Sequence, residues 1–188
     1  MSFQPRPVRR VVTGTDAQGR SRVLYDGPAP NVNPPSANPP RYAAMTDVWV
    51  FEQCPAELSG ERDDGALPYR FEPPPAGGHF RIVESPKKPP GYVRENDPVY
   101  VAPHEPRRRP DGVLVRGGQS AYTTAMHKSE TVDYGFCVSG ERVLVLDRQT
   151  LVMRPGDVVV QLGNWHLWSG ERDHTVMAFV MMSARYEG

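Results

Sequence analysis

Proline is distributed very unevenly along this chain of 188 residues, and this asymmetry constrains the fold more than any other feature. Twenty of the 21 prolines precede residue 111, and Pro155 alone follows it. Proline has no backbone N–H to donate to a β-ladder, so it is rare in central strands. We therefore expect loops, turns and edge strands in residues 1–110, and continuous ladders in residues 111–188.

After residue 120, apolar and polar side chains alternate with a period of two, which indicates strands rather than helices. Shorter segments of the same kind occur upstream, and the first two flank a turn at residues 16–19, so we expect a hairpin there. No segment carries a helical stripe. The pattern predicts an all-β fold of short antiparallel strands, either a sandwich or a barrel. The expected strands are residues 9–13, 21–25, 47–51, 79–84, 141–147, 151–153, 158–161 and 174–183.

The length of the chain suits one domain with one core. We expect the proline-rich residues 1–110 to add strands and loops that pack on a barrel formed by residues 111–188. Three long segments are predicted to be loops, which are either functional covers or mobile. These segments are residues 27–40, 57–75 and 87–110.

Charge and composition exclude several classes of function. Lys and Arg total 22, as do Asp and Glu, and this balance argues against nucleic-acid binding, which needs a net basic surface. The basic run Arg107 to Arg109 is interpreted as part of a solvated loop. No apolar run reaches membrane-spanning length, and the N-terminus lacks a signal-peptide core, so we expect no membrane partner and a cytoplasmic location.

Two histidines, His127 and His166, are separated by one strand-turn-strand excursion, after which a barrel wall returns to the same pocket. Strand alternation gives His127, Ser129 and Asp133 the same parity, and it gives His166 and Trp168 a common face. Two imidazoles and one carboxylate predict a site for a divalent metal ion with open coordination positions.

Alternatives remain for each part of this site. Glu130 has the opposite parity to Asp133, but a bulge would re-aim it, so it competes as ligand and as general base. Tyr134 is a candidate proton donor. The simpler interpretation is that His127 and His166 are hydrogen-bonded pocket histidines without a metal. His79 is assigned to a surface strand end in preference to the barrel mouth.

The side chains around the histidines predict a pocket for an organic molecule. Trp165 and Trp168 flank His166, and an aromatic wall suits a hydrophobic or ring-containing organic acid. Gln161 and Ser129 are polar candidates for the same pocket. Arg81 is a candidate carboxylate clamp, against the alternative of an exposed strand arginine.

These residues resemble the two motifs of the cupin superfamily. In the first motif, His127, Asp133 and Gly140 match, although Asp133 stands for the usual Glu and Ser129 for the second histidine. In the second motif, Gly156, Gly163 and His166 match with a spacing one residue shorter. The resemblance covers about residues 120 to 183 and implies the cupin barrel, which is a jelly roll or double-stranded β-helix.

The resemblance also implies a function. For a cupin with these side chains we expect one divalent ion (Fe, Mn, Ni or Zn) on His127, Asp133 and His166, with Glu130 as a candidate further ligand. The expected substrate is a small organic acid, and the expected reaction is decarboxylation, oxygenation or isomerisation.

Two other classes of function stay open. The serine at position 129 favours a metal-free barrel that binds or senses a small molecule without catalysis. An interaction protein that uses the proline-rich loops is the third alternative. Because cupins commonly pair through edge strands, we also expect a homodimer built with the N-terminal strands.

Overall fold

The computed structural model describes residues 3–37, 40–41, 43–58, 62–93, 96, 105–108, 114–116, 126–170 and 173–187. The fold is all-β, as predicted, and the described residues add one 3-10 turn, η1 (Asp64–Ala66). The strands are β1 (Arg9–Thr15), β2 (Ser21–Pro28), β3 (Asn31–Asn33), β4 (Ser36–Ala37), β5 (Pro40–Arg41), β6 (Ala44–Phe51), β7 (Gly78–Ser85), β8 (Arg107–Arg108), β9 (Leu114–Arg116), β10 (His127–Ser129), β11 (Thr131–Ser139), β12 (Arg142–Val145), β13 (Thr150–Met153), β14 (Val158–Leu162), β15 (Leu167–Ser169) and β16 (Thr175–Ser183).

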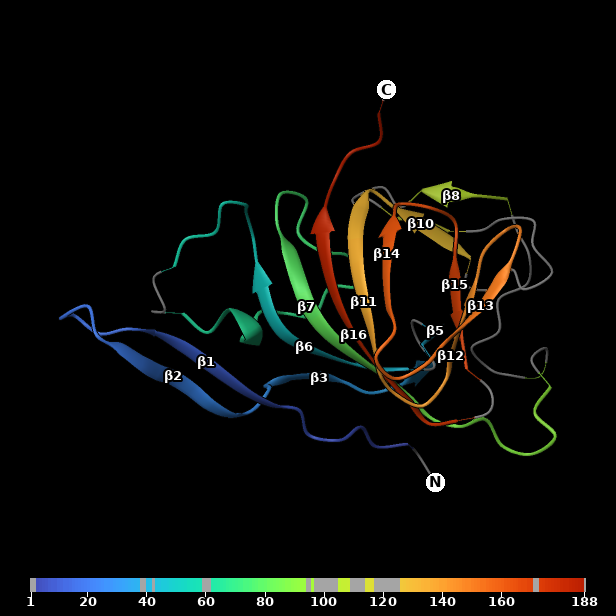
Figure 1. Cartoon of the computed structure of the whole chain (residues 1–188), viewed down its shortest axis with the longest axis horizontal. Helices are drawn as coiled ribbons and strands as arrows, with labels where there is room; N and C mark the ends of the chain where they lie inside the picture. Colours follow the sequence, from blue (N-terminus) through green and yellow to red (C-terminus); the bar gives the residue numbers. More distant parts are fainter. Residues whose placement is uncertain are drawn as a thin grey trace.

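Two sheets form the barrel. The main sheet has the order β14-β11-β16-β7-β6-β3, and a second sheet has the order β13-β12-β15 (Figure 1). From β11 to β16 the chain passes between the two sheets four times, and every ladder among these strands is antiparallel. Such crossing between two sheets is the topology of a jelly roll, so the predicted cupin-type barrel is confirmed.

Strand alternation builds the core between the sheets. Along β11, the buried residues Thr131, Asp133, Gly135 and Cys137 alternate with more exposed ones. Cys137 packs in a buried cluster with apolar side chains from both sheets. A Cβ at Gly135 would lie 2.8 Å from the Phe179 ring, so only glycine allows that ring to pack across the strand. The cluster consists of Cys137, Leu144, Met153, Met177 and Phe179.

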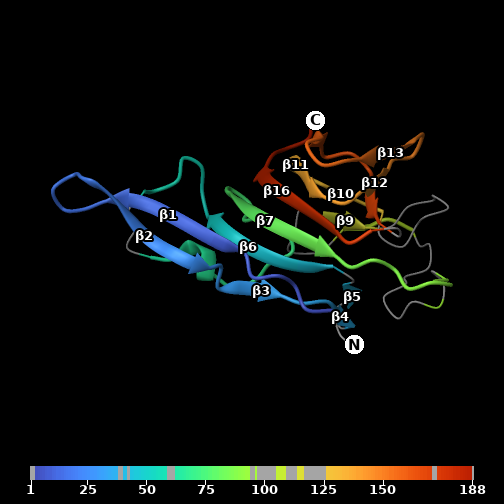
Figure 2. The same cartoon turned by 60° about the horizontal axis from the view of Figure 1, so that its bottom comes forward.

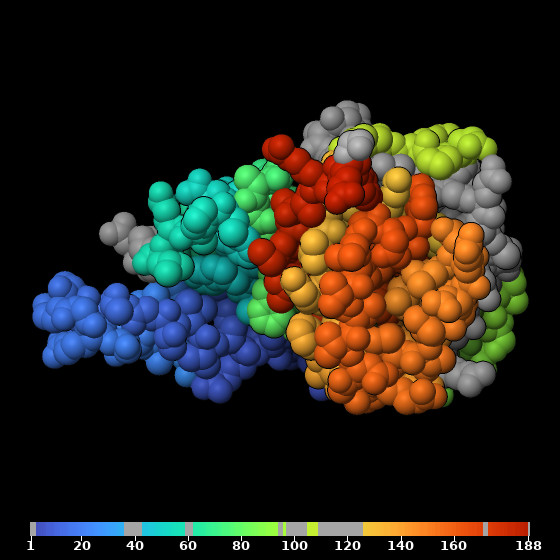
Figure 3. Space-filling view, turned by 45° about the horizontal axis from the view of Figure 1, so that its top comes forward, coloured from blue at the N-terminus to red at the C-terminus, as the bar shows by residue number. Residues whose placement is uncertain are grey.

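The predicted N-terminal hairpin is also present, but it does not join the barrel. β1 and β2 form a separate two-stranded sheet that projects from the rest of the molecule (Figures 2 and 3). Its base is anchored by Arg10, a buried side chain that is paired with Asp63 and donates to the Val48 carbonyl oxygen at 3.2 Å. The Arg10 guanidinium also lies 5.9 Å from the centroid of the Trp49 ring.

The expectation of a loop over residues 27–40 was wrong in part. β3 pairs with β6 at the edge of the main sheet, and β4 pairs with β5. These strands are only two or three residues long, and Pro40 is itself the first residue of β5, a position in which a strand tolerates proline. Much of the predicted loop at residues 87–110, with Arg109, lies outside the described residues. No helix in the described part of the chain is long and apolar enough to cross a membrane.

Candidate functional site

The structure brings His127 and His166 side by side. They form an isolated antiparallel bridge in which each backbone N–H donates to the other residue's carbonyl oxygen at 2.9 Å. Directly opposed residues of an antiparallel pair project to the same side. The two imidazole centroids accordingly lie 4.3 Å apart, with the rings inclined at 57°. The two motifs therefore meet at one point of the barrel.

The environment of His166 fixes its chemistry. The side chain is buried, and burial lowers the pKa of its imidazole, so the ring is neutral at neutral pH. Nδ1 lies 2.9 Å from the Asn164 carbonyl oxygen, to which only an N–H can donate. The proton is thus on Nδ1, and Nε2 keeps a lone pair for a ligand, a proton or a metal ion.

Asp133 projects into the barrel from β11. Its side chain is buried, and its Oδ1 atom has no hydrogen-bond partner within the described structure. Burial raises the pKa of this carboxyl group to about 6, against the opposing effect of a hydrogen bond with Thr131. The Thr131 hydroxyl in turn lies 2.6 Å from the Ser129 hydroxyl. The Ser129 hydroxyl is therefore buried and hydrogen-bonded to Thr131, which in turn contacts Asp133.

Gln161 lies directly opposite Asp133 in the β11–β14 ladder. It is buried as well, and neither its Oε1 nor its Nε2 atom has a partner among the described residues. A buried amide without hydrogen bonds costs on the order of 1–3 kcal/mol, so native structures seldom leave one unpaired. Asp133 and Gln161 together present an acceptor, a donor and a titratable group to the interior.

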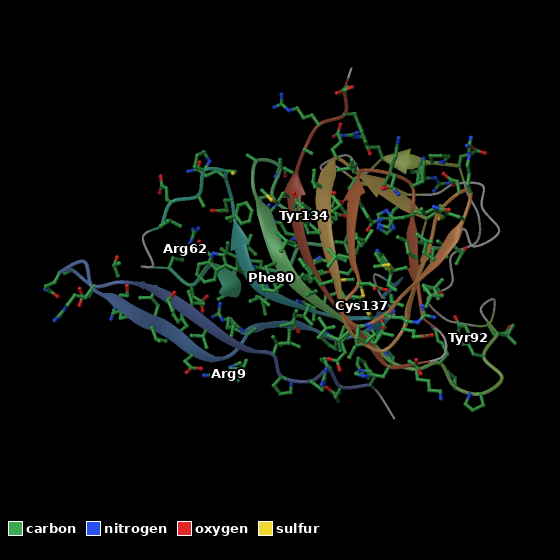
Figure 4. The ribbon with its side chains drawn as sticks, in the orientation of Figure 1. Arg9, Arg62, Phe80, Tyr92, Tyr134 and Cys137 are labelled. Carbon is green, nitrogen blue, oxygen red and sulfur yellow. The ribbon has the colours of Figure 1, made fainter. Side chains whose placement is uncertain are left out.

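Two predicted site residues are directed elsewhere. Tyr134 alternates with Asp133, so its side chain lies on the outer face of the sheet and is 39% exposed (Figure 4). It is not a proton donor inside the barrel. Glu130 accepts a hydrogen bond from the Arg108 guanidinium at 2.6 Å, so its carboxylate is paired in a surface ion pair. Of the two carboxylates, Asp133 is the one that lies inside the barrel.

Arg81 is buried, but its guanidinium is already occupied. Nε donates to the Asp47 carboxylate at 2.5 Å, and Nη1 donates to the Phe71 carbonyl oxygen at 2.8 Å. Nη2 donates to the Arg70 carbonyl oxygen. The predicted substrate clamp is therefore a structural anchor for the segment around Phe71. Phe71 places its ring edge-on to His127, with centroids 6.2 Å apart.

His79 is not at the surface, contrary to prediction. β7 begins at Gly78, where an added Cβ would lie 2.5 Å from the Met181 carbonyl oxygen, and alternation along the strand then directs His79 and Arg81 inward. Burial and the nearby Arg81 charge lower the pKa of His79 to about 2, so the ring is neutral. Its ring lines a cavity of about 50 Å³, enough for a few water molecules. The other lining residues are Asp47, Val50, Glu52, Leu67, Pro68, Arg70, Glu72 and Pro74.

The two tryptophans have different positions. Trp168 packs on the core between the sheets and meets the Phe179 ring edge-on at 5.4 Å. Trp165 packs instead with a second buried cluster that contains Met126, Val145 and Leu167. Because Leu144 and Val145 alternate along β12, this cluster lies on the other face of the second sheet. Trp165 is therefore outside the interior pocket that was predicted for it.

The predicted metal ligands fit an ion in part. His127 and His166 offer two adjacent nitrogen donors, and the tautomer of His166 is the one that metal ligands use. Within the described ranges, no three His, Cys, Asp or Glu side chains are grouped closely enough to hold an ion. An ion on the histidine pair would take its other ligands from substrate or water. Metal binding stays a prediction.

Sequence reasoning missed the residues that support the site. Phe71, Thr131 and Asp47 each touch a predicted site residue. The inward position of Thr131 could have been predicted from strand alternation, because it lies two residues from both Ser129 and Asp133. Nothing in the sequence pairs Asp47 with Arg81 or brings Phe71 to His127, because both contacts join distant segments.

No family model matches the chain. Three curated fungal proteins are similar over part of it, and the chain spans less than half the length of each. Phomopsin biosynthesis cluster protein D of Diaporthe leptostromiformis is 36% identical over 88 residues, which is 40% of this chain and 46% of that protein. Phomopsin biosynthesis cluster protein C' of the same organism is 42% identical over 73 residues, with coverage of 37% and 36%. The cupin-domain-containing oxidoreductase virC of Hypocrea virens is 34% identical over 80 residues, with coverage of 41% and 38%.

Two solved structures with a similar fold are a cupin domain and a EutQ protein. The cupin domain of Schizosaccharomyces pombe Cnp3 aligns with a TM-score of 0.42 at 9% identity, covering 93% of this chain and 87% of that one. The EutQ protein of Clostridium difficile aligns with a TM-score of 0.44 at 9% identity, with coverage of 93% and 88%.

Proposed function

We propose that this cupin-type barrel is an enzyme acting on a small organic acid held between its two sheets. One observation carries the proposal: Asp133 and Gln161 face each other inside the barrel with buried polar atoms that have no partner among the described residues. A bound molecule with both an acceptor and a donor would satisfy them.

The roles follow from the chemistry of each side chain. The Gln161 amide N–H would donate to a carboxylate or carbonyl oxygen of the substrate, and its own oxygen would accept from a hydroxyl. Asp133, with a pKa of about 6, is mostly ionised at neutral pH and would accept a proton as general base. The Nε2 atom of the neutral His166 would accept a hydrogen bond from a substrate hydroxyl group. Trp168 would exclude water from the core side.

A divalent ion is part of the proposal. His127 and His166 would supply nitrogen ligands, and substrate or water would supply the others, because Asp133 is not grouped with the two histidines closely enough to hold the same ion. Such an ion would act as a Lewis acid on a substrate oxygen. The similarity to a protein named an oxidoreductase is compatible with an oxygenation, and decarboxylation and isomerisation remain as the other proposed reaction types.

Ligand binding tests the interior site directly. We expect a panel of small aliphatic and aromatic carboxylates to contain at least one that binds the purified protein, measured by calorimetry. Gln161→Leu should weaken that binding about tenfold or more, because it removes the buried amide that orients the ligand. Tyr134→Phe, on the outer face of the same sheet, is the control and should bind normally. Equal binding by all three proteins would place the ligand elsewhere.

Metal addition tests the histidine pair. An ion that binds only the folded protein raises its melting temperature, by an amount that grows with concentration above Kd. We expect Mn, Fe, Ni or Zn to stabilise the wild type and to be retained after gel filtration. His166→Ala should abolish both effects, whereas the control His174→Ala, which removes a histidine paired with Glu84, should keep them.

The metal-free binding barrel is the second candidate, and the lack of a three-ligand group within the described residues favours it. It shares the predicted loss of ligand binding in Gln161→Leu. It differs in that no metal would shift the melting temperature of the wild type.

A further inference from the structure

One row of side chains on the inner face of the main sheet extends the pair of Gln161 and Asp133 across two more strands. Asp133 of β11 lies opposite Met181 of β16, and Met181 lies opposite His79 of β7 (Figure 1). The three polar members of this row are at least 95% buried. Each has a nitrogen or oxygen atom without a hydrogen-bond partner among the described residues. Buried polar atoms are seldom left unpaired, so three in one row indicate a ligand that reaches all of them.

The barrel interior is accessible at this row. Met177, Phe179 and Met181 all project inward from β16, because their ladder partners on β11 are Cys137, Gly135 and Asp133. Met177 and Phe179 are buried, whereas Met181 is only half-buried. The space between the sheets is therefore filled near Cys137 and is open above Met181. This opening lies between the Asp133 end of the row and the His79 end.

An irregularity in β6 shapes the His79 end. The register with β7 shifts between Asp47 and Trp49, so that Asp47 opposes Arg81 and Val50 opposes His79. Asp47 and Val50 thus share the inner face although they are three residues apart. Bulges of this kind are frequent beside binding sites. Here the bulge directs Val50 toward the cavity of about 50 Å³ that His79 lines.

The chain segment at residues 67–74 covers this cavity and is fixed at both ends. Asn31 donates from Nδ2 to the Leu67 carbonyl oxygen at 2.5 Å, and Ser183 donates from its hydroxyl to the Pro74 carbonyl oxygen at 2.5 Å. Arg81 holds the middle of the segment at the Phe71 carbonyl oxygen. The cavity is therefore a defined part of the interior rather than a gap beneath a loose loop.

The charges around the cavity favour an uncharged polar group. Asp47, Glu52 and Glu72 contribute to its lining, and their carboxylates would repel an anionic group of a ligand. Burial and the Arg81 charge lower the pKa of His79 to about 2, and the same surroundings disfavour an ammonium group beside the ring. A hydroxyl group is uncharged, and it can donate to or accept from either tautomer of a neutral imidazole.

We propose that the substrate is a hydroxy acid whose carboxylate binds Gln161 and whose hydroxyl group, at the far end of an apolar body, binds His79; this rests on the proposed function. Neighbouring strands are about 4.8 Å apart, so the backbones at Asp133 and His79, two strands apart, are separated by about 10 Å. An aromatic ring with a short side chain spans such a distance. Its apolar body would pack on the Met181 thioether, and His79 would determine the specificity for the hydroxyl group.

Two rigid acids of nearly the same shape test the role of His79. Calorimetry should show that the wild type binds para-hydroxycinnamate about tenfold more tightly than cinnamate, because one further buried hydrogen bond forms. His79→Leu should bind both acids equally, with the affinity of the wild type for cinnamate. The control His174→Leu removes a histidine that is paired with Glu84, and it should keep the tenfold preference.

Gln161→Leu separates the role of His79 from the proposed function. It should weaken the binding of both acids by the same factor and keep the tenfold ratio, because the two contacts lie at opposite ends of the ligand. If Gln161→Leu weakens both acids but the wild type has no preference, or His79→Leu keeps the preference, the assignment of His79 is overturned and the proposed function stands.

The remaining outcomes are also decisive. If neither acid binds the wild type, the assignment of His79 is overturned, and the wider panel of carboxylates decides the proposed function separately. If circular dichroism shows His79→Leu to be unfolded, His79→Phe takes its place, since an apolar ring fills the volume of the imidazole without a hydrogen-bonding atom. A tenfold preference that persists in folded His79→Phe overturns the assignment in the same way.

Discussion

Asp133 is an interior side chain whose ionisation is linked to folding. In the unfolded chain an aspartate has a pKa of 3.8, whereas burial raises the pKa of Asp133 to about 6 in the folded protein. The folded state therefore binds the proton more tightly. Stability from this group is fully present below pH 3.8 and is lost as pH rises through 6, which is the opposite of an aspartate held in an ion pair.

The substitution Asp133→Asn isolates this effect, because the amide cannot ionise. Between pH 4 and pH 7.5 we expect the free energy of unfolding of the wild type to fall relative to that of the variant by on the order of 2–3 kcal/mol. Urea unfolding at both pH values measures the difference. Parallel pH profiles for the two proteins would show that the carboxyl group is solvated or paired when folded.

At the scale of elements, the buried pair of Arg81 on β7 and Asp47 on β6 ties the segment around Phe71 to the main sheet. Both side chains are at least 97% buried, so each is desolvated and depends on the other. Breaking such a pair leaves one buried charge unpaired, whereas replacing both charges by apolar groups is often tolerated. Asp47 and Arg81 are opposite each other in the β6–β7 ladder, and Arg81 also donates to the Phe71 carbonyl oxygen. The contact of the Phe71 ring with His127 therefore depends on this ion pair.

A double-substitution cycle tests this dependence. Arg81→Met should lower the free energy of unfolding by about 3–5 kcal/mol, and Arg81→Met with Asp47→Leu should recover most of that loss. Urea unfolding gives all the required values. A double variant no more stable than the single one would mean that the segment is held by other contacts, and that Arg81 carries more than a structural charge.

At the scale of the whole molecule, the two faces of the main sheet carry different kinds of side chain. Its inner face carries Asp133, Gln161, His79 and Arg81, and its outer face carries apolar rows. A register shift of one residue along β11 would exchange these faces and place Asp133 in solvent. The position of the candidate site is therefore set by the alternation of side chains along this strand.

Local patterns in the sequence determined the fold class, the hairpin at the N-terminus and most strand positions, because alternation and turn residues act over short distances. They also indicated that His127 and His166 meet. Tertiary structure decided what the sequence left open: Glu130 pairs with Arg108, Arg81 with Asp47, and Trp165 packs in the second cluster. Each of these outcomes depends on contacts between segments far apart in the chain, which residue parity alone does not specify.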